Sequence, residues 1–254
     1  DPLFLDRLRD EFDNLKAITE LRRRRRELLA FQERIAAMTF FDPACGSGNF
    51  LTETYLSLRR LENEVVRAAA VDTQDMPALG EAFTPIRVSI DRFYGIEIND
   101  FAVVVARTAM WIAETSMKRE TASIVHHDLD FFPLRSEAHI AEDNALRLDW
   151  RTVCPAPDYI IGNPPFVGQT LQTDEQKNDL LAVFVDEAGK PYKAAGKIDY
   201  VAGWYYKAAE MMQGTSIRAA LVSTNSITQG EQVAFVWKPL VDRFGIHIDF
   251  AYRT

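Results

Sequence analysis

The residues with the clearest capacity for chemistry begin in a glycine-containing segment that reads FFDPACGSGNFL. Asp42 follows a short apolar run, and Gly46 and Gly48 stand in the turn ahead of a helical pattern. In open α/β sheets, a carboxylate and an exposed backbone at the end of a strand lie in the crevice where ligands bind. We call residues 42–50 the glycine turn and expect it to hold a cofactor.

Two kinds of cofactor compete for the glycine turn. A dinucleotide fingerprint requires a third glycine at the position of Leu51, and the carboxylate of Asp42 would repel a pyrophosphate. S-adenosylmethionine (SAM) carries an ammonium and a sulfonium, so the negative charge of Asp42 favours it. A nicotinamide dinucleotide is the less favoured ligand, and a tight turn without a ligand is the remaining alternative.

A second segment, IIGNPPF, supplies groups that could activate an amine. Two prolines directly after a buried strand prevent a continuing ladder and fix an extended turn. The side-chain oxygen of Asn163 and the carbonyl of Pro164 could then accept hydrogen bonds from one exocyclic amino group, while Phe166 stacks on its ring. Two fixed acceptors favour the pyramidal amine that attacks a sulfonium methyl, and neither a general base nor a metal is required. We call residues 163–166 the proline turn.

Two further strand ends complete the candidate site. Glu97 ends the run RFYGIEI, where a carboxylate could accept both hydroxyls of a ribose. Asn144, in IAEDNALRLDW, could bind an adenine amino edge. Residues 126–130 (HHDLD) compete for that adenine role, and we favour Asn144 because it lies one short connection before the next strand.

Short apolar runs alternate with helical patterns over most of the chain, which predicts an α/β fold with a doubly wound, mostly parallel sheet. The expected strands are residues 39–42, 92–98, 158–162, 220–224 and 246–252. Helices are expected after the glycine turn, over residues 101–115, around 200–212 and around 231–244. Residues 71–90 and 121–138 fit no element and are expected to be loops or insertions.

The N-terminal segment has helical spacing without glycine or proline from residue 3 to residue 41. It predicts an N-terminal helical arm, either one long helix or two helices end to end. Five consecutive arginines, Arg22 to Arg26, would point all round such a helix. We therefore favour a solvated, salt-bridged surface over a contact with DNA or a partner.

Composition excludes several classes of protein. With 254 residues, 2 cysteines and 47% hydrophobic residues, the chain is neither a disulfide scaffold nor disordered, and no run of about 20 apolar residues predicts a membrane span. The formal net charge of −8 argues against binding nucleic acid through bulk charge alone. No signal peptide is visible, so we expect a cytoplasmic protein, and the lack of an initiator methionine suggests a fragment of a longer chain.

These motifs together resemble those of the SAM-dependent DNA adenine N6 methyltransferases of the gamma order, in which the cofactor motif precedes NPP[YF]. Within that group the chain looks most similar to the methyltransferase region of MmeI-like (type IIL) restriction-modification enzymes. The resemblance runs through DPACGSGNFL, YGIEIND with ARTAMWIAE, DNALRLDW, DYIIGNPPFVG, IDYVAGWYYKAAEMM and ALVSTNSITQGEQV.

The resemblance implies a Rossmann-like SAM methyltransferase fold and assigns roles to single residues. Asp42 and the backbone from Ala44 to Asn49 would hold the methionine part of SAM, Glu97 the ribose and Asn144 the adenine. The full implied cofactor set is Asp42, Pro43, Ala44, Cys45, Gly46, Gly48, Asn49, Phe50, Glu97, Ile98, Asn144 and Ala145. The implied catalytic set, which would hold the target base, is Asn163, Pro164, Pro165 and Phe166.

The resemblance also implies partners and boundaries. We expect double-stranded DNA with a flipped adenine as substrate, and bacterial or archaeal cytoplasm as the location. Residues 1–38 would form the helical arm and residues 39–254 the catalytic domain, with a target-recognition domain and possibly a nuclease outside this segment. Residues 168–190 are expected to form a mobile loop that closes over the flipped base, with an ordinary surface connection as the alternative. Methylation of a protein glutamine or an RNA adenine, and a non-catalytic SAM-binding scaffold, are the alternatives.

Overall fold

A computed structural model describes residues 3–71, 85–125, 136–186, 188–192, 195–230 and 232–252. Its centre is a five-stranded sheet in the order β3-β2-β1-β4-β5, and all paired strands are parallel. The strands are β1 (Phe40–Asp42), β2 (Phe93–Glu97), β3 (His139–Glu142), β4 (Tyr159–Gly162) and β5 (Arg218–Leu221). The prediction of a doubly wound α/β sheet is therefore confirmed.

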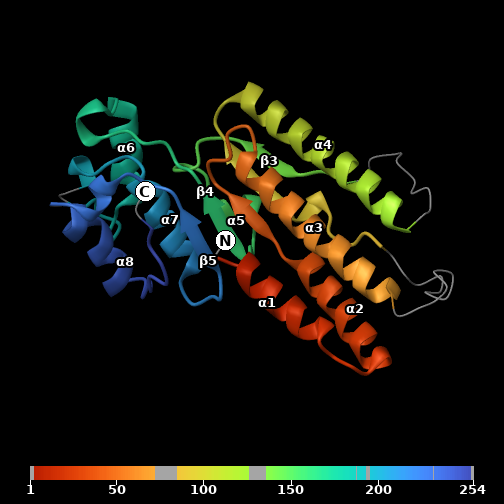
Figure 1. Ribbon diagram of the computed structural model, residues 1–254. Coiled ribbons are helices and arrows are strands. Elements are labelled where there is room, and N and C mark those ends of the chain that lie inside the picture. Colours follow the sequence, from red (N-terminus) through yellow and green to blue (C-terminus); the bar gives the residue numbers. More distant parts are fainter. Residues whose placement is uncertain are drawn as a thin grey trace.

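Helices cover both faces of the sheet (Figure 1). On one face lie α1 (Leu5–Lys16), α2 (Leu21–Ala37), α3 (Asn49–Val71) and α4 (Asp100–Val125). The other face packs against α5 (Trp150–Val153), α6 (Asp174–Val183), α7 (Ala202–Met212) and α8 (Lys238–Asp242). Neighbouring strand residues point to opposite faces, so Phe40 belongs to the first hydrophobic core and Phe41 to the second.

The N-terminal segment forms two helices rather than one. Ala17 ends α1, and the side chain of Glu20 caps α2 by accepting hydrogen bonds from the amides of Arg22 and Arg23. The apolar faces of both helices, including Phe12 and Phe31, belong to the same hydrophobic core as Phe40 in the sheet. Leucine and phenylalanine at helical spacing thus place α1 and α2 beside α3, as Figure 1 shows.

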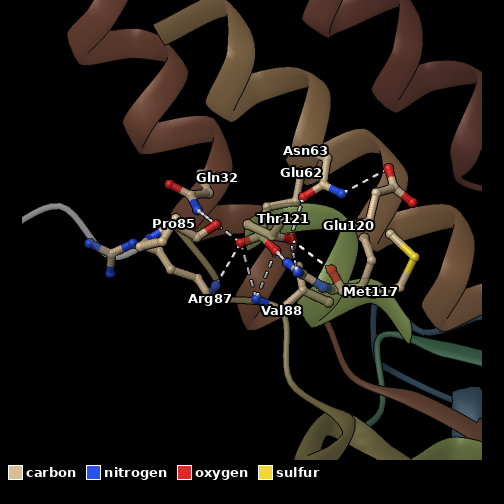
Figure 2. A network of polar contacts seen from close by, with 10 residues as sticks. Gln32, Glu62, Asn63, Pro85, Arg87, Val88, Met117, Glu120 and Thr121 are labelled. Atoms are coloured by element: carbon tan, nitrogen blue, oxygen red, sulfur yellow. Dashed lines mark hydrogen bonds and ion pairs between the residues drawn. The ribbon is translucent and has the colours of Figure 1, made fainter. Parts of the chain in front are cut away.

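A buried polar network fastens α2, α3 and α4 to the segment that leads into β2 (Figure 2). Glu62 and Arg59, both fully buried on α3, form an ion pair, and Arg59 also donates to Thr121 on α4 at 2.7 Å. Glu62 accepts from the side chain of Gln32 at 2.9 Å and from the amide of Arg87 at 2.7 Å. These hydrogen bonds replace the contacts with water that the polar side chains lose on burial.

Two predicted strands differ from the structure at the far end of the sheet. β5 begins two residues and ends three residues before the predicted 220–224. Its ladder stops where Gly162 of β4 is followed by the proline turn, whose two prolines have no amide hydrogen to donate. Residues 246–252 form no strand. No described strand pairs with them, and most of their side chains are exposed.

Two segments predicted as loops need correction. α4 continues into the predicted loop 121–138 as far as Val125. The predicted loop 71–90 meets α3 only at Val71 and a short 3-10 helix only at Ile90, and residues 85–89 between them form no helix or strand. Residues 72–84 and 126–135, including the alternative adenine contact at 126–130, lie outside the described residues. Residues 168–190 contain the helix α6, which buries Asp179 and Leu180, so the prediction of a loop was wrong over residues 174–183. None of the described helices is long and apolar enough to cross a membrane.

Candidate active site

The predicted site residues gather at one edge of the sheet. The glycine turn follows β1, Glu97 ends β2, Asn144 follows β3 and the proline turn follows β4. Because all these strands are parallel, their carboxyl ends face the same side. The chain runs outward from β1 to β3 in one direction and from β4 to β5 in the other, so β1 and β4 flank the switch point at which α/β sheets bind ligands.

The glycine turn is tightly packed at Gly48 and open at Gly46. Gly46 and Gly48 have φ values of 54° and 82°, which favour glycine. A Cβ on Gly48 would lie 3.1 Å from Ala106 of α4, so the turn packs tightly on that side, whereas a Cβ on Gly46 would meet no atom within 4 Å. The open side lies over Gly46, where a ligand can approach the backbone. Asn49 and Phe50 begin α3 and are exposed.

Asp42 is a fully buried carboxylate with one free oxygen. Its Oδ1 accepts from the amide of Ala44 at 2.9 Å, and its Oδ2 has no hydrogen-bond partner among the described residues. Burial, and to a smaller extent the charge of Glu97, raises the pKa of Asp42 from 3.8 to about 7, against the lowering effect of the Ala44 amide. A buried acceptor without a donor is costly, so Oδ2 of Asp42 is available to a hydrogen-bond donor of a ligand.

Gly162 joins the cofactor half of the site to the proline turn. A Cβ on Gly162 would lie 2.8 Å from Oδ1 of Asp42, so no other residue fits there without displacing the carboxylate. Asn163 follows directly and is exposed, Pro164 is buried, and the side chain of Phe166 is 47% exposed. Gly162 lies next to the buried carboxylate of Asp42, and the predicted acceptors of the proline turn begin at the next residue along the chain, Asn163.

Glu97 ties the first two strand ends together. Its Oε2 accepts from the amide of Gly46 at 2.9 Å, and its Oε1 accepts from the amide of Asn99 at 2.9 Å. The neighbouring Ile98 is 67% exposed and presents an apolar surface at the same edge. Because each carboxylate oxygen can accept more than one hydrogen bond, Glu97 keeps acceptor capacity for a hydroxyl pair.

Asn144 is fixed by a residue that sequence reasoning missed. Its Nδ2 donates to Asp179 of α6 at 3.0 Å, and its Oδ1 accepts from the amide of Leu146 at 2.9 Å. Asp179 also accepts from Arg147 at 2.7 Å and from the hydroxyl of Tyr200 at 3.1 Å. This fixed orientation leaves the Asn144 oxygen one lone pair for a ligand amine. Ala145, beside it, is buried.

A second missed contact supports the glycine turn from the opposite face of the sheet. The indole of Trp204 on α7 donates to the carbonyl of Pro43 at 2.9 Å. Cys45, in the same turn, is buried, and burial raises the pKa of its thiol well above its ordinary range. Trp204 and Pro43 lie 161 residues apart, and Asp179 and Asn144 lie 35 apart, so no local pattern signals either contact.

Comparison with known proteins places this architecture in the α/β class of methyltransferase domains. It is similar to the Type IIL restriction-modification enzyme MmeI, solved in complex with DNA, at 41% identity and a TM-score of 0.83 over 95% of this chain. The family model "MmeI, DNA-methyltransferase domain" matches residues 18–254, so the chain belongs to this family. It is also 42% identical, over its whole length, to DNA methyltransferase A of Bacillus subtilis (strain 168).

Both relatives are much longer than this chain. The chain spans 27% of DNA methyltransferase A and 31% of the solved MmeI chain. It corresponds to the methyltransferase domain of such proteins, as the sequence resemblance implies.

Proposed function

We propose that this chain transfers a methyl group from SAM to the exocyclic N6 amine of an adenine in DNA, as the catalytic domain of a longer restriction-modification enzyme. The observation that carries the proposal is the contact of Gly162 with Asp42. This contact supports the proposal because it brings the proline turn close to a buried carboxylate whose Oδ2 has no hydrogen-bond partner among the described residues. Membership of the MmeI methyltransferase family supports the same reaction.

The glycine turn suits SAM in charge and in space. Oδ2 of Asp42 would receive the cationic end, the backbone from Ala44 to Asn49 would line the methionine part, and the open face over Gly46 leaves room for it. Glu97 would hold the ribose, and the fixed oxygen of Asn144 would hold the adenine amine. The exposed apolar side chains of Phe50 and Ile98 flank these polar groups, as a mixed adenosine surface requires.

The proline turn would act on the target amine. When bound, SAM supplies an electrophilic methyl group on a sulfonium. Asn163 and the carbonyl of Pro164 would accept hydrogen bonds from the adenine amine, which frees its lone pair for attack, and Phe166 would stack on the ring. The fixed backbone of Pro164 and Pro165 holds these acceptors without reorganisation during the reaction.

An adenine inside a duplex cannot reach the edge of this sheet, so the base must be flipped out of the stack. The net charge of −8 does not favour binding to DNA through bulk charge. We infer that other parts of the longer protein, chiefly a target-recognition domain, supply most of the DNA affinity. The enzyme would act in the cytoplasm of a bacterial or archaeal cell.

The proposal is tested by giving the full-length protein tritiated SAM with DNA, RNA and protein substrates in parallel. We expect label only in DNA, as N6-methyladenine at one sequence, which modified-base sequencing then maps. Label in RNA or in protein glutamine would replace the proposed substrate. SAM binding without transfer to any substrate would favour the alternative of a non-catalytic scaffold. Binding of a nicotinamide dinucleotide without SAM binding would contradict the assignment of SAM as the cofactor.

The pH dependence of SAM binding gives a second test. The ionised form of Asp42 attracts the cation, and its pKa in the free protein is about 7. We therefore expect the Kd for SAM to rise as the pH falls below about 7, approaching tenfold per pH unit. Calorimetric titration of the wild type and of Asp42→Asn measures this slope. The variant should bind weakly at every pH, and an equal slope in both proteins would contradict the role of Asp42.

The pH dependence of folding stability that Asp42 causes without SAM is opposite to the pH dependence of SAM binding. SAM binding weakens as the pH falls, whereas stability increases. Its pKa is higher in the folded protein than the ordinary 3.8 of an unfolded chain, so the folded state binds more protons between these values. The contribution of Asp42 to stability is present at low pH and is lost as the pH rises through about 7.

A further inference from the structure

A cavity of about 350 Å³ opens beside the proline turn. It lies between the segment that follows Phe166 and the 3-10 turn after β5, residues Asn225–Thr228. Its lining includes Phe166, Gln169, Asp199, Thr224, Ser226 and Gln232. Because the exposed ring of Phe166 forms part of its wall, the cavity is continuous with the surface on which the target base would stack.

Asp199 connects the two walls of this cavity. Its Oδ1 accepts from the amide of Gln169 at 3.0 Å, and its Oδ2 accepts from the hydroxyl of Ser226. Its own amide donates to the side chain of Gln232 at 3.1 Å. The next amide, that of Tyr200, donates to the carbonyl of Val167 at 2.9 Å. Asp199 thus connects its own segment to two others, one about 30 residues before it and one about 30 residues after it along the chain.

The chemistry of Asp199 suits a positioning role. The carboxylate is only 7% exposed, and each oxygen already accepts a hydrogen bond from the protein. Hydrogen bonds to an ionised acceptor are the stronger kind, so the carboxylate resists separation of the walls. The hydroxyl of Ser226 also pairs with that of Thr224, which extends the same contact along the wall after β5.

We propose that Asp199 is a positioning residue that holds the walls of the target-base cavity at the spacing that keeps the flipped base against the proline turn. The inference rests on the proposed function and adds a residue outside its cofactor and catalytic sets. Loss of Asp199 would let the segment after Phe166 move away from Ser226. The base would still enter but would spend less time in the reactive position.

The test compares Asp199→Ala with Asp199→Asn in the full-length protein, on DNA that carries the mapped methylation site. Asp199→Ala should lower kcat about 10- to 100-fold with an unchanged Kd for SAM, since misplacement by about 1 Å has effects of this size. Asp199→Asn should keep kcat within about threefold, because its oxygen can accept from Gln169 and its amide can donate to Ser226. Asp174→Ala, whose carboxylate is 99% exposed on α6, is the matched control.

The fluorescence of 2-aminopurine at the target position reports whether the base is held outside the stack. Its increase on binding should be smaller than in the wild type for Asp199→Ala, but not for Asp199→Asn or Asp174→Ala. Wild-type kcat in Asp199→Ala, or an equal loss in Asp199→Asn, would overturn the proposal. If Asp199→Ala does not fold, Ser226→Ala decides: lower kcat at unchanged Kd for SAM supports the proposal, and wild-type kcat refutes it. Failure of the proposed function is distinct, because the wild-type protein would then not methylate DNA at all.

Discussion

Asn163→Ala is expected to lower the rate of methyl transfer about 100- to 1000-fold, the usual loss when one preorganised hydrogen-bond partner of a reacting group is removed. Alanine leaves the carbonyl of Pro164 as the only acceptor at the proline turn, so the adenine amine would stay conjugated with its ring. The Kd for SAM should stay within about threefold, because Asn163 is not among the proposed cofactor contacts. Single-turnover transfer of tritiated methyl groups and calorimetric binding of SAM measure the two effects separately.

Asn178→Ala is the matched control for this change, because Asn178 is exposed on α6 and lies outside the proposed site. It should keep both the rate and the Kd for SAM. Turnover of Asn163→Ala within a few-fold of the wild type would show that Asn163 does not activate the amine. An equal weakening of SAM binding would instead place Asn163 in the cofactor site.

Glu62→Ala is expected to destabilise the fold by about 3–5 kcal/mol, the range measured when one partner of a buried ion pair is removed. The change would leave the buried Arg59 without its counter-ion and the amides of Arg87 and Val88 without their acceptor. Urea unfolding, followed by circular dichroism, gives the free energy of unfolding. SAM binding below the unfolding transition should be unchanged, because the network lies away from the carboxyl ends of the strands.

A surface ion pair on the same helix provides the comparison. Glu53 pairs with Arg60 at 3.4 Å, but its side chain is 68% exposed. Glu53→Ala should therefore cost no more than about 1 kcal/mol. Similar decreases in the free energy of unfolding in the two variants would mean that the buried Arg59–Glu62 pair contributes no more to stability than an ordinary surface ion pair.

The sequence predicted the inner sheet well because its strands are short apolar runs that end in polar or glycine residues. β1, β2 and β4 lie at the predicted places, and the break between α1 and α2 is one of the two predicted arrangements. The outer parts were less predictable. The end of β5 depends on its partner Gly162, and residues 246–252 alternate without a strand to pair with.

α6 shows where a local signal was overlooked. Its polar composition suggested a loop, but Thr173 and Gln176 form a capping box that is visible in the sequence as Thr-x-x-Gln. The predicted site residues do come to one edge of the sheet, although their binding roles stay predictions. Asp179, Trp204 and Asp199 could not have been found, because each acts on a segment far away along the chain and only the fold brings them together.

The pairing of β1 with β4 has a consequence for the way such proteins can change. Phe41 pairs with Ile160, and adjacent strands lie about 4.8 Å apart whatever side chains they carry. In the proposed reaction this pairing fixes the distance between methyl donor and methyl acceptor, since Asp42 ends β1 and Asn163 directly follows the neighbouring β4 at the same edge of the sheet. A longer protein could therefore exchange the parts that choose a DNA sequence and keep the reacting distance unaltered.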